Sequence, residues 1–95
     1  MKSNVSLQVI PDTEKEEDLY PIVDKVIELI KDSGVKYEVG PMETTMEGEL
    51  DELLEIVKKA QFICENQGAR RVLSVVKIDY KPSGVTMGEK IGKYR

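Results

Sequence analysis

The chain contains no histidine and no tryptophan, and it has a single cysteine. Without histidine, Ser-His and Cys-His catalysis, histidine-ligated zinc and the usual acid–base group near neutral pH are excluded. The one cysteine, Cys64, cannot form a disulfide within the chain, and its place on the apolar side of an expected helix favours a buried, hydrophobic role. We therefore expect a protein that is not an enzyme, with no catalytic residues, no metal site and no cofactor.

Long apolar runs and an excess of basic residues are also missing. No apolar stretch approaches the ~20 residues that a membrane span needs, and the first ten residues lack a signal-peptide core. The net charge of −4 and the pI of about 4.9 argue against a nucleic-acid-binding surface. We expect one domain over residues 1–95, in the cytoplasm, that binds neither membranes nor nucleic acid. A domain this small gains stability from oligomerisation.

The first third of the chain has the pattern of a strand followed by an amphipathic helix. Apolar and polar residues alternate over residues 4–10, which predicts a strand that Pro11 ends. Thr13 and Glu16 have the spacing of a capping box. Apolar residues then recur at helical spacing as far as Gly34, which suits a left-handed C-cap.

The rest of the chain repeats this alternation of strand and helix. Gly40-Pro41 predicts a turn or bulge, Gly48 suits the N-cap of a second amphipathic helix, and Gly68 suits its end. The remaining strands are expected over residues 35–39, 42–47 and 71–81. The order βαββαβ predicts an α+β, ferredoxin-like sandwich, in which a four-stranded antiparallel sheet carries both helices on one face.

The open face of this sheet is expected to carry the function. If Met42 and Met46 pack in the core, Glu43, Thr45 and Glu47 point to the open face. Alternation on the other strands brings the following residues to the same face: Ser6, Gln8, Leu73, Val75, Lys77 and Asp79. The apolar members of this face predict contact with a second subunit. The polar members suit a flat, polar heterocycle that can carry a positive charge.

Other uses of this face remain open on the residues alone. A wet subunit interface, with Lys77 paired to Glu43 or Glu47 across the sheet, would need no organic ligand and would make the oligomer a regulatory or structural module. Arg70 and Arg71, with the basic end of the tail, could bind a small anion, although a solvated edge is the favoured interpretation. Residues 84–93 lack the Gly-Lys-Ser/Thr ending of a phosphate loop and are expected to form a short arm or helix that packs on a neighbour.

The central motif also resembles that of a known family. Gly40-Pro41-Met42, Thr44 and Glu47-Gly48-Glu49, running into Asp51-Glu52, are similar to the signature of the thiamine-binding, YkoF-like family of small ferredoxin-like proteins. The strand that ends at Pro11 and the segment Val76-Lys77-Ile78-Asp79 also match, so the resemblance covers nearly the whole chain. It implies a non-enzymatic protein that binds thiamine or its hydroxymethylpyrimidine part and assembles through its sheets into dimers and tetramers.

The resemblance also implies which residues bind the ligand. By position, these are Thr44, Thr45, Glu47, Lys77 and Asp79. Glu43 stands where many relatives are expected to have a smaller residue, which would narrow the pocket or change its charge.

Overall fold

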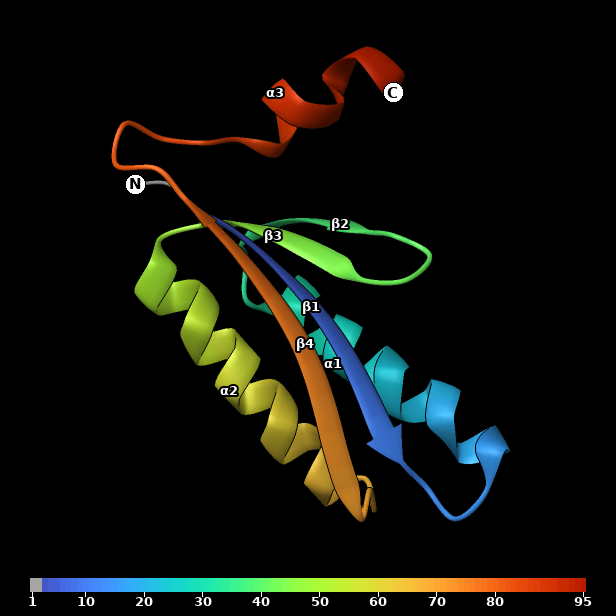
Figure 1. Ribbon diagram of the computed structural model, residues 1–95. Coiled ribbons are helices and arrows are strands. Elements are labelled where there is room, and N and C mark those ends of the chain that lie inside the picture. Colours follow the sequence, from blue (N-terminus) through green and yellow to red (C-terminus); the bar gives the residue numbers. More distant parts are fainter. Residues whose placement is uncertain (1–2) are drawn as a thin grey trace.

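The computed structural model describes residues 3–95, and its elements follow the order βαββαβ with a short helix added at the end (Figure 1). The strands are β1 (Ser3–Asp12), β2 (Lys36–Val39), β3 (Thr44–Gly48) and β4 (Arg71–Tyr80); the helices are α1 (Leu19–Asp32), α2 (Leu50–Asn66) and α3 (Met87–Ile91); the 3₁₀ turns are η1 (Glu16–Asp18) and η2 (Gly92–Tyr94). The predicted α+β, ferredoxin-like architecture is confirmed.

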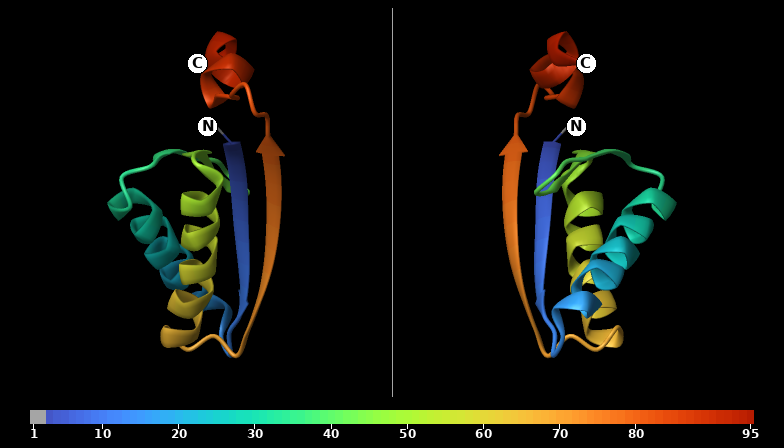
Figure 2. Two further views of the ribbon diagram at one scale, coloured as in Figure 1. Left: turned by 90° about the vertical axis from the view of Figure 1, so that its left-hand side faces the viewer. Right: turned by 90° about the vertical axis from the view of Figure 1, so that its right-hand side faces the viewer.

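The four strands form one antiparallel sheet in the order β2-β3-β1-β4. Val5 of β1 lies opposite Met46 on one side and Ile78 on the other, and the next residue, Ser6, lies opposite Thr45 and Lys77. Directly opposed residues share a face of the sheet, so this register separates an apolar face from a polar one. Figure 2 shows α1 and α2 on the same side of β1 and β4.

The core lies between the apolar face of the sheet and the two long helices. Val5, Met46 and Leu53 are fully buried there, and Ile30 is 1% exposed. Burying a side chain of this size contributes about 1.5–3 kcal/mol. The apolar stripes expected from the sequence supply the helical side of this core. Ile22 and the other buried residues of α1 and α2 recur at intervals of three or four. Gly34 and Gly68 follow the two helices with φ of 83° and 96°, as the expected C-caps require.

The predicted capping box at the start of α1 is wrong. The Thr13 hydroxyl donates to the backbone carbonyl of Lys15, and the helix begins only at Leu19, after η1. The chain is still extended at this point because β1 continues past Pro11 to Asp12. β3 pairs with β1 only as far as Leu7, and a proline is tolerated where a strand has no neighbour on one side.

Two boundaries near the central motif also differ from expectation. The hairpin turn between β2 and β3 extends to Glu43, whose carbonyl accepts the Gly40 N–H at 2.9 Å. Met42 therefore lies in the turn, where its side chain is 74% exposed, and does not belong to the core. Gly48 is the last residue of β3, and Glu49 occupies the N-cap position of α2. No helix within residues 3–95 is long and apolar enough to cross a membrane.

Candidate functional site

A pocket of about 500 Å³ lies between the polar face of the sheet and the C-terminal segment. The chain leaves β4 and turns back, so that α3 lies on the side of the β2–β3 hairpin opposite α1 and α2 (Figure 1). The pocket is lined by Asn4, Ser6, Glu38, Gly40, Pro41, Glu43, Thr45, Lys77, Ile78, Asp79, Met87, Lys90, Ile91 and Arg95. It is thus built from all four strands, the hairpin turn and the tail.

The sheet supplies two rows of polar side chains to this site. In the first row, Thr45 and Lys77 lie on either side of Ser6, and in the second, Glu47 and Asp79 lie on either side of Asn4. Asn4 and Ser6 are two residues apart on β1, so the rows are adjacent on one face. Hydroxyl, amide, carboxylate and ammonium groups therefore converge within a few strand spacings.

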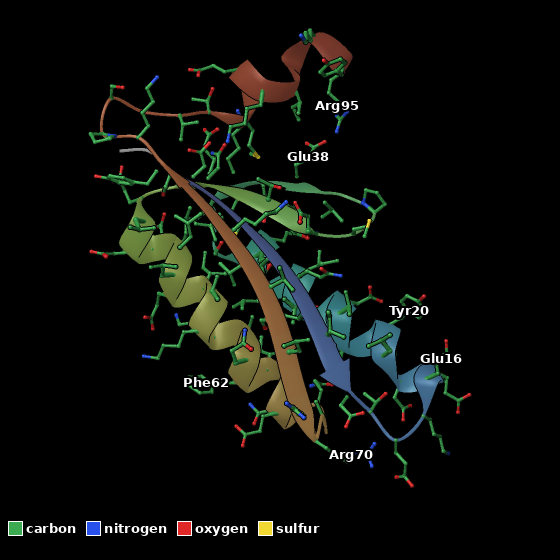
Figure 3. All side chains as sticks on the ribbon, viewed as in Figure 1. Glu16, Tyr20, Glu38, Phe62, Arg70 and Arg95 are labelled. Carbon is green, nitrogen blue, oxygen red and sulfur yellow. The ribbon has the colours of Figure 1, made fainter. Side chains whose placement is uncertain are left out.

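Every carboxylate that lines the pocket forms an ion pair with a cation that lines it. The Lys77 Nζ lies 3.0 Å from Glu43 Oε1, which is one of the two pairings expected for this lysine. The Lys90 Nζ lies 2.6 Å from Asp79 Oδ2. The Arg95 Nε lies 3.1 Å from Glu38 Oε1, and Figure 3 shows these two side chains facing one another. Among residues 3–95, the charges that line the pocket therefore balance.

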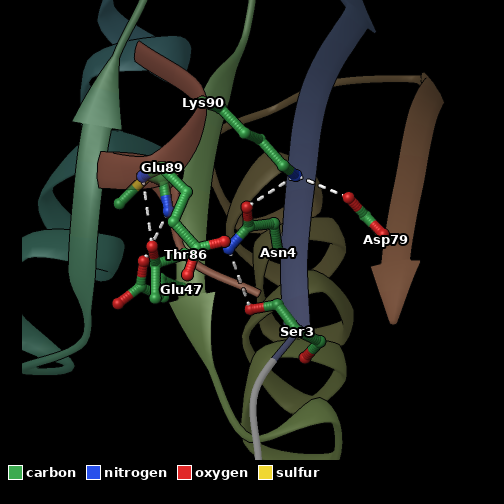
Figure 4. A network of polar contacts seen from close by, with 8 residues as sticks. Ser3, Asn4, Glu47, Asp79, Thr86, Glu89 and Lys90 are labelled. Atoms are coloured by element: carbon green, nitrogen blue, oxygen red, sulfur yellow. Dashed lines mark hydrogen bonds and ion pairs between the residues drawn. The ribbon is translucent and has the colours of Figure 1, made fainter. Parts of the chain in front are cut away.

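The tail is held against the sheet by polar contacts, which Figure 4 shows, and by two buried apolar residues. The backbone N–H of Met87 donates to Glu47 Oε1 at 2.7 Å. Thr86 is the N-cap of α3, and its hydroxyl accepts the backbone N–H of Glu89. The side chains of Val85 and Met87 are 7% and 6% exposed, so this part of the tail is packed against the rest of the chain.

The structure brings three of the five predicted site residues together. Thr45, Lys77 and Asp79 all line the pocket. Glu47 lies on the same face, but its carboxylate receives the Met87 N–H and does not line the pocket. Thr44 is 6% exposed and lies opposite Leu7 on the apolar face of the sheet, because successive residues of a strand point to opposite faces.

Several pocket residues were not among those predicted from the sequence. Asn4 shares its face of β1 with Ser6, so the alternation of that strand could have indicated it. Glu38 lies opposite Thr45 across the hairpin and could have been found in the same way. Met87, Lys90 and Arg95 come from the tail, and no local pattern places them over the sheet.

An apolar patch occupies the other end of the polar face. Ile10, Leu73 and Val75 are 42%, 59% and 43% exposed, and Ile10 lies directly opposite Leu73. We name these three residues the apolar patch. They lie on the same face as the pocket, as predicted from the alternation of β4.

No group of three or more histidine, cysteine, aspartate or glutamate residues within residues 3–95 is arranged to hold a metal ion. Cys64 is fully buried in the core and forms no disulfide. Burial raises the pKa of its thiol above the ordinary value. Cys64 therefore has the structural role expected from the sequence.

Comparison with known proteins gives a consistent picture. Residues 5–95 match the pattern of a family described as thiamine-binding protein. A UPF0045 protein of Clostridium perfringens is 67% identical over 92 residues, which cover 97% of this chain and 96% of that protein. A solved domain of unknown function from Bacillus cereus is 51% identical with a TM-score of 0.93, covering 100% of this chain and 91% of that one.

A further solved structure carries a functional description. It is a candidate thiamine biosynthesis or salvage protein from Thermotoga maritima, 43% identical to this chain, with a TM-score of 0.91 and full coverage of both chains. These similarities extend over the sheet, both long helices and the tail. The chain described here therefore belongs to the thiamine-binding protein family.

Proposed function

We propose that the protein binds thiamine, or a molecule that contains its hydroxymethylpyrimidine part, in the pocket between the polar sheet face and the tail. The observation that carries this proposal is the pocket itself. Its volume of about 500 Å³ falls in the range of small-molecule sites, and its polar groups lie in two rows beside apolar walls. The family to which the chain belongs supports the same class of ligand.

The pocket offers a partner for each part of such a ligand. Thiamine combines an aminopyrimidine, which both donates and accepts hydrogen bonds, with a positively charged thiazolium ring. A carboxylate such as Glu43 can accept from an exocyclic amino group, and the hydroxyls of Ser6 and Thr45 can donate to a ring nitrogen. Met87 and Ile91 supply apolar surface that can cover the face of a ring.

In this proposal the protein binds its ligand without making or breaking a covalent bond. The chain has no histidine, and its pocket carboxylates are paired with lysine and arginine. Such a protein would sequester, deliver or sense its ligand in the cytoplasm. A lone cysteine that is buried and unpaired is compatible with that compartment.

We further propose that a second copy of the chain covers the apolar patch. The patch is exposed and continues the face that holds the pocket. An apolar patch of this kind can pair with the same patch of a second copy about a two-fold axis, and a domain of this size benefits from the added burial. Leu73→Glu should shift the oligomer to smaller species in analytical ultracentrifugation. Phe62→Glu is a matched control, since Phe62 is 51% exposed but lies on α2. Equal masses for the wild type and Leu73→Glu would contradict the assignment of this interface.

Calorimetric titration with thiamine and with hydroxymethylpyrimidine tests the binding proposal. Thr45→Val should weaken binding about two- to tenfold, which is the effect of one lost hydrogen bond. Thr44→Val is the matched control, because this neighbouring threonine faces the helices, and it should change the affinity less than twofold. Absence of binding at millimolar ligand would favour the alternative function, a regulatory or structural module that assembles through its sheet face. Binding of phosphate alone would favour an anion site.

A further inference from the structure

The pocket owes its charge balance to the tail. Within residues 3–95, the lining from the sheet and hairpin contains three carboxylates and one lysine, a formal charge of −2. The two cations that complete the balance, Lys90 and Arg95, both belong to the C-terminal segment. Without these two side chains, the sheet side of the pocket would present an acidic surface to any ligand.

The ammonium group of Lys90 is held by two acceptors from neighbouring strands. Its Nζ lies 2.6 Å from Asp79 Oδ2 and 2.7 Å from Asn4 Oδ1, as Figure 4 shows. Asn4 is only 4% exposed, and its Nδ2 donates to the carbonyl of Ser3, which leaves Oδ1 directed at the lysine. An aspartate oxygen and a fixed amide oxygen thus form an electronegative site that holds one positively charged group.

We propose that Asn4 Oδ1 and Asp79 Oδ2 form a cation subsite of the ligand pocket. Lys90 fills this subsite in the structure, and a positively charged ligand takes the place of the lysine when it binds. The inference rests on the proposed function, and it adds the chemical class that the site selects: an organic cation in preference to a neutral ring.

The tail is built so that Lys90 can leave. The Lys90–Asp79 and Arg95–Glu38 pairs are both exposed, with side-chain exposures of 42% and 53% in the first and 60% and 43% in the second. Exposed pairs of this kind contribute little and are screened by salt. The ordered helix α3 has five residues, and glycines stand within it and just after it.

The apolar anchor of the tail precedes this part of the segment. Val85 and Met87 are buried, whereas Gly88, Glu89 and Lys90 are exposed. The chain beyond Met87 can therefore move while Met87 keeps its place in the pocket wall. Lys90 then acts as an internal competitor: the apparent association constant equals the intrinsic one multiplied by the fraction of molecules in which the subsite is free.

Calorimetric titration of wild-type protein, Lys90→Met and Lys93→Met tests this inference. The Lys90→Met variant should bind thiamine about two- to fivefold more tightly than the wild type at low salt, and the gain should shrink as salt is added. Hydroxymethylpyrimidine, which is neutral, should show a smaller gain. Lys93 is the matched control, because its Nζ lies over the Tyr94 ring at 5.1 Å and does not line the pocket.

Asp79→Asn is a second variant that keeps the shape of the subsite and removes its charge. It should weaken the binding of thiamine more than that of hydroxymethylpyrimidine. Equal thiamine affinities for the wild type and Lys90→Met would overturn the inference while the proposed function stands. If neither protein bound thiamine but both bound hydroxymethylpyrimidine, only the inference would fall; if neither ligand bound, both proposals would fall. Binding by Lys90→Met alone would support the subsite strongly, since the lysine would then be the barrier to the ligand.

Discussion

Glu47 holds the tail in place in this structure, and its removal gives the sharpest prediction about the pocket. Met87 is the first residue of α3, and the N–H groups of a first helical turn have no partner within the helix. Glu47 Oε1 accepts this N–H at 2.7 Å, across 40 residues of sequence. A hydrogen bond to a charged acceptor contributes about 1.5–3 kcal/mol. Glu47→Ala should therefore make opening of the tail about tenfold more frequent or more.

Amide hydrogen exchange measured by NMR checks this effect at the residue concerned. The Met87 amide should lose about tenfold or more of its protection in Glu47→Ala and less in Glu47→Gln, which keeps an acceptor oxygen. Glu55→Ala is the surface control, since Glu55 pairs only weakly with Lys58 on the exposed side of α2. Unchanged protection of Met87 in Glu47→Ala would refute the role of Glu47 in holding the tail. Loss of thiamine binding with the tail still protected would instead support direct contact between Glu47 and the ligand.

Three further predictions concern the hydrophobic core and the hairpin that surround the pocket. Met46→Ala should lower the free energy of unfolding by about 2–5 kcal/mol in urea titrations, because this side chain is fully buried in the core. Gly40→Ala should destabilise the hairpin and lower the melting temperature, since a Cβ there would lie 2.9 Å from the Glu43 carbonyl oxygen. Gly92→Ala is the control for stability, because its added Cβ would meet nothing within 4 Å and should leave the melting temperature unchanged. Cys64 should react with a thiol reagent far more slowly than a free cysteine at pH 7, because burial raises its pKa and blocks access, and urea should restore the rate.

The faces of the sheet could be predicted from the sequence because alternation along a strand is a local property. Once Met46 is assigned to the core, Thr45 must face the other way, and the same logic places Lys77 and Asp79 beside it. For Thr44, the family motif and the alternation of the strand lead to different expectations. Its place in the motif suggested a ligand contact, whereas its position in the strand puts it under the helices.

The misplaced boundary at Met42 and the unpredicted pocket residues of the tail arose where local patterns compete or where distant segments meet. Met42 fits the alternation of β3, but the turn that starts at Gly40 extends beyond it and exposes its side chain. The tail joins the site through contacts such as that between Lys90 and Asn4, which are 86 residues apart. Nothing in the spacing of residues 84–93 specifies such a contact, so the tail was expected to pack on a neighbour.

The structure of the protein in complex with thiamine, solved by crystallography, would test the central claim most directly. The account predicts that the ligand lies between Thr45 and Met87, with its positive charge at Asn4 and Asp79 and with Lys90 displaced from Asp79. Thiamine bound on the other face of the sheet, in the small crevice beside Thr44, or bound in the pocket with the Lys90–Asp79 pair intact, would contradict it.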